Sequence, residues 1–314
     1  MVSTDKNQSS EVVFILLGFS DYPDLQVPLF LLFVIIYAVS VVGNGGMIVI
    51  IHISPKLHTP MYFFLKNLSF VDFCCSTVVT PKLIENLVVE DRTISIKCCI
   101  TQFFFATTCV MTEMVMLAVM AYDRLVAICY PLLYSVAMSP KVCSVLVTVA
   151  YSWGIIIAVI LTYSILILSF CETKPIDNFV CEYLVFLLVS CSDKHFSETI
   201  LFIFVSLSAI CTLTIILSSY LFIFGTILKM HSASGRHKAF STCTSHLTAV
   251  TIFYGTILFL YCIPNSKNTG LLVKIGSAFY TVMIPMLNPL IYSLRNKDVK
   301  ETFRKLMDLK TISQ

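Results

Sequence analysis

The chain has 314 residues, of which 57% are hydrophobic and only 12% are charged, and its mean hydropathy is +0.89. Soluble globular proteins are about 45–50% apolar with about a quarter of their residues charged. This chain therefore has too little polar surface to be covered by water, and its composition predicts that lipid is its solvent. The net charge of +3 gives no indication of a nucleic-acid partner.

Seven stretches are long and apolar enough to cross a membrane, since a spanning helix needs roughly 20 apolar residues. They are 27–52, 60–82, 99–122, 142–168, 198–228, 239–262 and 271–293. Pro60 suits the first turn of the second helix, where its missing N–H is not needed. We predict an all-α membrane protein, a seven-transmembrane helix bundle in one domain over 1–314, with tails at 1–26 and 294–314 flanking the bundle at 27–293.

Lys and Arg are unequally divided between the two sides of this bundle. One side (52–60, 122–141, 229–240, 293–314) holds twelve Lys or Arg and four Asp or Glu, whereas the other (1–26, 85–99, 170–199, 262–275) holds seven and twelve. The basic side belongs in the cytoplasm. This predicts an extracellular N-terminus and a cytoplasmic C-terminus. Val299, Phe303 and Leu306 recur at helical spacing, which predicts a short amphipathic helix over 296–308 on the inner leaflet.

The first apolar patch, Val12–Leu17, is too short for a signal peptide and has no basic leader. Asn7-Gln8-Ser9 is a glycosylation sequon on the predicted outer tail, so Asn7 is a candidate glycosylation site. Several cysteines fall on or near the oxidising side, where disulfides persist; they are Cys98, Cys99, Cys171, Cys181 and Cys191. The cysteines and histidines do not have the spacing of a metal site, and we expect neither a metal nor a cofactor.

Four polar side chains occupy similar depths on four different predicted helices: Asn44, Asp72, Glu113 and Asn288. Asp72, for example, lies twelve residues into its helix, or about 18 Å of rise. A buried charge in lipid is costly unless it is paired, neutralised or hydrated, so we expect a shared polar cluster. Two functions remain open: a site sensitive to a cation or proton, or a hydrogen-bonded plug that fixes helix register.

Asp123 and Arg124 lie where the long apolar run 103–121 ends. Taken alone, Arg124 is most simply a membrane-boundary anchor with Asp123 as its local partner. The alternative is a latch, an ionic contact that holds the bundle closed until a ligand releases it. The segment 238–247 is unusually polar for a membrane helix, and we interpret His246 within it as a solvated interfacial histidine in preference to a pH switch.

Six motifs in order along the chain resemble the odorant (olfactory) receptor family of the rhodopsin-like G-protein-coupled receptors. They are LHTPMYFFL at 57–65, MAYDRLVAIC at 120–129, Ser219-Tyr220, KAFSTCTSHL at 238–247, FYGT at 253–256 and PMLNPLIYSLRN at 285–296. The HTPMYFFL wording is similar to the class II branch. The resemblance spans nearly the whole chain and implies a receptor in the plasma membrane that couples odorant binding to a heterotrimeric G protein.

The resemblance implies roles that hydropathy cannot show. Arg124 would be the latch whose release admits the C-terminal helix of the G protein, and Tyr220 and Tyr292 would be its partners in the active state. The helix with Ser241 and His246 would move outward, and Asn288-Pro289 would belong to the activation machinery. Cys99 would pair with Cys181 and Cys171 with Cys191; Cys99 is preferred over Cys98 because the family has Cys-x-x-Gln and Gln102 follows at that spacing.

The chain departs from the family pattern at two positions. Leu125 stands where a tyrosine usually follows Asp-Arg, which puts the strength of coupling and the basal activity in question. Thr212 stands near the place where many members carry a proline in the fifth helix, so the local backbone there is not defined by the resemblance.

The resemblance also implies a mostly apolar ligand pocket in the outer half of the bundle. Its expected lining residues are Thr107, Val110, Met111, Phe204, Ser208, Tyr254, Ile257, Tyr261 and Thr281. Because this set contains no charged residue, we predict small neutral volatile ligands such as alcohols, aldehydes, esters, ketones and terpenoids. The expected partner is a stimulatory, olfactory-type G protein that raises cAMP, with trafficking accessory proteins as further candidate partners.

Rival classes have less support in the sequence. The chain lacks the metal spacing, the phosphate-binding glycine loop and the nucleophile–base arrangement of an enzyme. A transporter or channel using Asp72 and Glu113 is the strongest alternative, but such proteins commonly contain internal repeats, and we find no convincing repeat. An opsin-like receptor needs a lysine inside the seventh helix, whereas Lys274 lies at the outer end of that helix.

Overall fold

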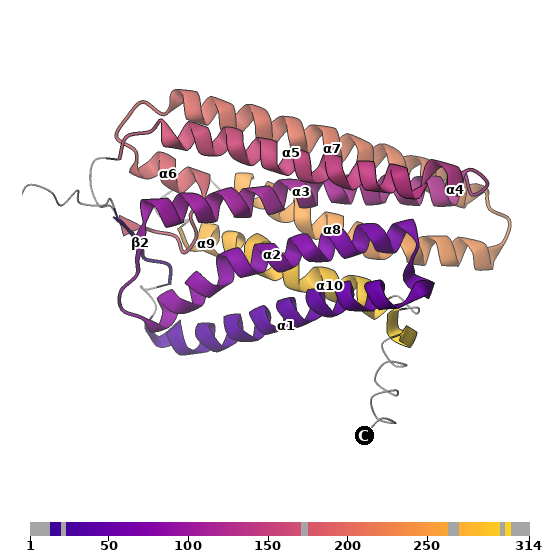
Figure 1. Cartoon of the computed structure of the whole chain (residues 1–314), viewed down its shortest axis with the longest axis horizontal. Helices are drawn as coiled ribbons and strands as arrows, with labels where there is room; N and C mark the ends of the chain where they lie inside the picture. The colour runs from indigo at the N-terminus through magenta and orange to yellow at the C-terminus, as the bar shows by residue number, and fades with distance from the viewer. Residues whose placement is uncertain (1–12, 20–22, 171–174, 263–269, 296–298, 303–314) are drawn as a thin grey trace, which may run out of the picture.

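The computed structural model describes residues 13–19, 23–170, 175–262, 270–295 and 299–302. Seven membrane-length helical segments lie side by side along the long axis (Figure 1). This confirms the predicted seven-helix bundle. Six of the segments are α1 (Gln26–Ile53), α2 (Pro60–Val88), α3 (Ile96–Cys129), α5 (Pro140–Leu166), α7 (His195–Lys229) and α8 (Ala233–Cys262). The seventh joins α9 (Gly270–Ala278), a π-helical turn η3 (Phe279–Met283) and α10 (Ile284–Arg295).

Two of these helices begin at a proline. Pro60 opens α2 after the N-cap Thr59, as expected, and Pro140 opens α5 after Ser139. Proline is tolerated there because the first N–H groups of a helix have no partner inside it. The 3₁₀ turn η2 (Pro55–Leu57) joins α1 to α2, and the short helix α4 (Tyr134–Ala137) follows α3.

The helix α3 is the centre of the bundle, because it packs against α2, α5, α7 and α8. Of the most apolar 18-residue stretch of α3, 67% is buried, whereas only 17% of the corresponding stretches of α1 and α7 is buried. The exposed faces of α1 and α7 are nevertheless strongly apolar, with side chains such as Ile35, Phe202 and Leu221. Such faces are stable in lipid and not in water, so the distribution of burial agrees with the membrane assignment.

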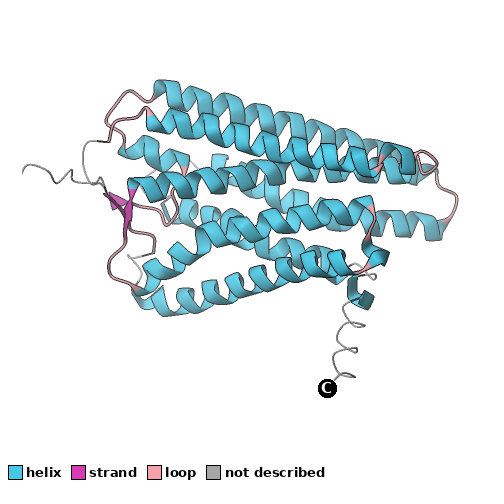
Figure 2. Cartoon of the chain, in the orientation of Figure 1, coloured by secondary structure: helices cyan, strands magenta, loops and turns pink. Residues whose placement is uncertain are grey.

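A small sheet at one end of the bundle is a feature that the all-α prediction lacks (Figure 2). Its strands are β1 (Val13–Leu16), β2 (Thr93–Ser95) and β3 (Pro175–Ile176), in the order β2-β1-β3. β1 pairs antiparallel with β2, placing Val13 opposite Ser95, and parallel with β3. The short helix α6 (Tyr183–Val189) lies at the same end, which we call the sheet end; the opposite end is the α4 end.

The strand β1 explains the apolar patch near the N-terminus. Phe14 and Leu16 are fully buried, and the ring of Phe14 meets Phe170 and Phe186 edge-on. The patch therefore packs over the loop that carries α6 instead of remaining part of a polar tail.

Three sequence predictions fall partly or wholly outside the described residues. Asn7 and Cys171 lie outside them, as do Phe303 and Leu306 of the predicted amphipathic helix. Residues 299–302 are helical and Val299 is buried, which is the described part of that helix. The glycosylation site and the pairing of Cys171 with Cys191 therefore remain predictions.

Candidate functional site

Three of the four mid-depth polar residues are joined by one amide group. The Asn288 side-chain nitrogen donates hydrogen bonds to Asp72 Oδ2 at 3.0 Å and to Glu113 Oε1 at 2.9 Å. All three side chains are buried. The bonds tie α10 to α2 and α3, so the cluster joins three helices that are far apart in the sequence.

Asn44 reaches this cluster through two serines. Its amide donates to the Pro285 carbonyl at 2.8 Å and contacts Ser40 Oγ at 3.4 Å. Ser40 donates to Ser76 Oγ at 3.0 Å, and Ser76 donates to the Asp72 carbonyl at 2.7 Å. The sequence reasoning missed Ser40 and Ser76, although each lies one helical turn from a residue that it did identify.

The arrangement holds helix register, because each bond requires two helices to be in one relative position. It also places two carboxyl groups on a single donor, and Asp72 Oδ1 has no hydrogen-bond partner among the described groups. Two like charges that share a buried site repel each other, and a proton or small cation would relieve the repulsion. The register role is what the contacts provide directly; the cation- or proton-sensitive role remains a prediction.

At the α4 end, Asp123 and Arg124 are both buried within the last turns of α3. The Asp123 carboxylate accepts a hydrogen bond from the Tyr134 hydroxyl at 2.9 Å. Tyr134 belongs to α4, so this contact fixes the connection that follows α3. The guanidinium of Arg124 acts electrostatically on Tyr220, on Tyr292 and on His246.

The placement of His246 corrects the interpretation of a solvated interfacial histidine. Its side chain is fully buried, because this part of α8 packs against α3 and α7. One ring nitrogen, Nε2, lies 3.0 Å from the Leu117 carbonyl, and Nδ1 lies 2.7 Å from the Tyr220 hydroxyl. A carbonyl only accepts, so Nε2 carries the proton and Nδ1 accepts from Tyr220. His246 thereby links α8 to α3 and α7.

The remaining predicted activation residues lie on α8 and α10. Tyr292 is buried, and its hydroxyl has no hydrogen-bond partner among the described groups. Ser241 is exposed on α8. Pro289 approaches α1 so closely that a Cβ at Gly43 would lie 3.2 Å from its ring. Leu125, the unusual residue after Asp-Arg, packs beside a buried cluster on α7 and α8 that includes Ile223 and Cys243.

At the sheet end, a disulfide joins Cys99 at the start of α3 to Cys181, with 5.4 Å between the Cα atoms. Cys98 is exposed and free. The Gln102 side chain accepts a hydrogen bond from the Cys181 N–H at 3.2 Å and donates to the Val78 carbonyl at 3.2 Å. Gln102 therefore holds the loop at Cys181, beside the disulfide, and connects this loop to α2.

Two acidic loop residues contact the seventh helical segment at this end. The Tyr280 hydroxyl donates to Glu182 Oε1 at 3.1 Å, and the buried Lys274 forms an ion pair with Asp177. Burial raises the pKa of the Glu182 carboxyl, and hydrogen-bonding side chains, Tyr280 among them, partly oppose this rise. Glu182 was not among the predicted site residues, although it directly follows a predicted disulfide cysteine.

The predicted ligand residues lie on α3, α7, α8 and η3, and the structure divides them between neighbouring apolar clusters. Val110, Tyr254 and Ile257 belong to one cluster, and Met111 and Phe204 to the other. The remaining described members are Thr107, Ser208 and Thr281; the Tyr261 side chain lies outside the described part of the chain.

Hydrogen bonds join several of these positions across helices. The Trp153 indole of α5 donates to Ser208 Oγ at 3.2 Å, and the Tyr254 hydroxyl of α8 donates to Thr212 Oγ1 at 2.7 Å. Thr212 stands near the position where the family resemblance implies a proline in many members. It lies in an unbroken α7 and donates a hydrogen bond to the Ser208 carbonyl. Ligand binding by this set remains a prediction.

Comparison with known proteins places this geometry in context. A family profile described as "Olfactory receptor" matches residues 33–310. Human olfactory receptor 5D18 is 60% identical over 100% of both chains, and human olfactory receptor 5D13 is 59% identical over 99% of both. Mouse olfactory receptor 1165 is 59% identical over 97% of this chain and 96% of its own. Squid rhodopsin shares the fold, with a TM-score of 0.73 over 90% of this chain and 80% of its own at 16% identity.

Proposed function

Because the chain belongs to the olfactory receptor family of G-protein-coupled receptors, we propose that it binds small neutral volatile molecules and activates a stimulatory G protein that raises cAMP. In the proposed orientation the sheet end is extracellular and the α4 end is cytoplasmic, in agreement with the excess of Lys and Arg on the α4 side. The receptor is a signalling protein and not an enzyme.

The observation that carries the proposal is that the Arg124 region and the predicted ligand residues lie toward opposite ends of the same helices. The Arg124 region lies at the α4 end and joins α3, α7 and α8 through His246. The predicted ligand residues lie nearer the sheet end on the same three helices and on η3. A ligand that changes how these helices pack near the sheet end therefore also affects their packing at the α4 end, where the G protein is proposed to bind.

The mechanism is a shift between two populations of the bundle. A ligand moves the balance toward the open arrangement only by as much as it binds that arrangement more tightly. In the structure, which we take as the closed arrangement, the Tyr220 hydroxyl is held by His246 and the Tyr292 hydroxyl has no hydrogen-bond partner among the described groups. Outward movement of α8 would break the first contact and free the Tyr220 hydroxyl to approach Arg124 together with that of Tyr292, while opening space for the C-terminal helix of the G protein.

The chemistry around the predicted ligand set favours neutral compounds. The described members are apolar or carry hydroxyl groups, and several hydroxyls already bond within the protein. Glu182 is an acidic loop residue that contacts η3, where it accepts a hydrogen bond from Tyr280. A carboxylate ligand would meet this acidic group with no basic side chain among the predicted lining residues to compensate it.

We expect cells that express the intact receptor and a cAMP reporter to respond to neutral volatiles in a dose-dependent way. The panel contains alcohols, aldehydes, esters, ketones and terpenoids, each matched by carbon number to a carboxylic acid and an amine. Cells carrying the empty vector are the control, and surface staining confirms that the receptor is present. A carboxylic acid as the strongest agonist would contradict the proposed ligand class; a ligand response without any change in cAMP would contradict the proposed coupling.

A further inference from the structure

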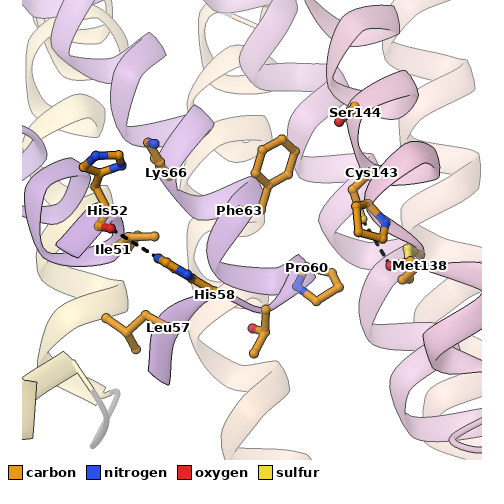
Figure 3. Close-up of a pocket in the computed structure, with 12 residues that line it drawn as sticks. Ile51, His52, Leu57, His58, Pro60, Phe63, Lys66, Met138, Cys143 and Ser144 are labelled. Atoms are coloured by element: carbon orange, nitrogen blue, oxygen red, sulfur yellow. Dashed lines mark hydrogen bonds between the residues drawn. The ribbon is translucent and has the colours of Figure 1, made fainter. Parts of the chain in front are cut away.

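A cavity of about 260 Å³ lies at the α4 end, apart from the Arg124 region and from the predicted ligand set (Figure 3). The end of α1, the turn η2, the first turns of α2 and the start of α5 line it. Among its lining residues, Leu57 and Met138 are buried, and Phe63 is an exposed aromatic. Its lining residues are Ile51, His52, Leu57, His58, Thr59, Pro60, Phe63, Lys66, Met138, Pro140, Cys143 and Ser144.

Lys66 is the charged side chain of this lining, which also contains two histidines, His52 and His58. His52, His58 and Lys66 face the cavity from α1, from the turn after η2 and from α2, and the lining contains no Asp or Glu. His58 Nε2 lies 3.2 Å from the His52 carbonyl, which positions its ring (Figure 3). Lys66 is half-buried, and its ammonium makes no ion pair with the described residues. The cavity is therefore complementary to an anion.

Two helix N-termini add to this positive character. The 29-residue α2 begins at Pro60 and the 27-residue α5 begins at Pro140, and both prolines line the cavity. The N-cap side chains Thr59 and Ser139 form no capping hydrogen bond. The first N–H groups of a helix and its dipole both favour an anion at this position, so the backbone acts in the same direction as the three basic side chains.

The occupant must also suit a membrane boundary. Lys66 lies six residues beyond Pro60, or about 9 Å into α2, and a lysine at this depth extends its ammonium toward the interface. Phe63 and Val142 are exposed apolar side chains beside the cavity. Contact with an acyl chain suits them better than contact with water. A ligand with a phosphate head and an apolar tail satisfies both surfaces.

We propose that this cavity binds an anionic phospholipid of the inner leaflet, with its phosphate between Lys66, His58 and the start of α2 and one acyl chain along Phe63. The proposal rests on the orientation given under the proposed function and does not depend on odorant binding. It assigns to the basic groups at this end a specific lipid contact, in addition to their general attraction to a negatively charged membrane surface.

The test measures binding of a fluorescent phosphatidylinositol 4-phosphate to the purified full-length receptor in detergent, without odorant. Lys66→Gln removes the charge and leaves a polar side chain only one atom shorter, and we expect it to weaken binding about fivefold, the effect of one lysine near an anionic surface. Lys66→Arg should bind within about twofold of wild type, since it retains the charge. Lys229→Gln, which removes an exposed lysine at the end of α7 outside the cavity, should have no effect.

Each other outcome overturns the proposal. Wild-type affinity in Lys66→Gln, or an equal loss in Lys229→Gln, would mean that the lipid binds elsewhere or nonspecifically. Equal affinity for a phosphatidylcholine probe would exclude recognition of the anionic head. Displacement by soluble inositol phosphates at the same concentration as the lipid would assign the cavity to a free phosphate. Because odorant is absent, none of these results bears on the proposed receptor function.

Discussion

Replacing Arg124 by Ala is expected to reduce the agonist-driven cAMP response to the level of cells without receptor. The guanidinium lies near the end of α3 beside Asp123 and interacts electrostatically with Tyr220 and Tyr292. It can therefore act as a strong hydrogen-bond donor to both tyrosine hydroxyls once α8 moves. Without it, the open arrangement loses its stabilising contacts and the ligand no longer shifts the population.

Controls separate this role from a folding defect. Arg124→Gln keeps most of the side-chain volume and should also be silent, because it cannot provide the positive charge. Lys141→Ala removes an exposed cation from the same end of the bundle and should respond as wild type does. Surface expression is measured with an N-terminal epitope on intact cells. Full signalling by Arg124→Ala at normal surface expression would refute the assigned role.

Removing either half of the disulfide is expected to abolish surface expression or the ligand response. The bond between Cys99 and Cys181 closes a long stretch of chain, with a sequence separation of 82. Loss of a native disulfide typically costs about 2–5 kcal/mol, and here it also releases the loop that carries Glu182. Cys99→Ser and Cys181→Ser should each show the defect, and the double variant should be no worse, since each single change already breaks the same bond.

Cys98→Ser is the matched control, because Cys98 is the exposed, free neighbour of Cys99. It should mature and respond normally. The measurements are surface staining and the cAMP response to one agonist at several concentrations. Normal responses in both Cys99→Ser and Cys181→Ser would contradict the structural role of the bond, and a defect in Cys98→Ser alone would reassign it.

The features that follow from helix geometry were predictable from the sequence. Hydropathy located the seven segments because a lipid environment demands long apolar helices. The common depth of Asp72, Glu113 and Asn288 followed from a fixed rise per residue, and their side chains meet in one hydrogen-bonded cluster. A regular element with a constant repeat thus converts sequence distance into position.

The features that depend on tertiary packing were not predictable in the same way. The three strands come from 13–16, 93–95 and 175–176, and each is too short to show alternation. His246 looked like an interfacial residue because its neighbours are polar, yet its burial is decided by α3 and α7. Glu182 belongs to a loop whose path is set by a disulfide and by Gln102. None of these contacts has a local periodicity.

The central claim is that the α4 end of this bundle faces the cytoplasm, where the G protein is. It is tested most directly by placing epitope tags at the N-terminus, in the connection between α7 and α8, and at the C-terminus of the full-length receptor. We predict that only the N-terminal tag is stained on intact cells and that the other two require permeabilisation. Staining of the α7–α8 tag on intact cells, or of both termini, would contradict it.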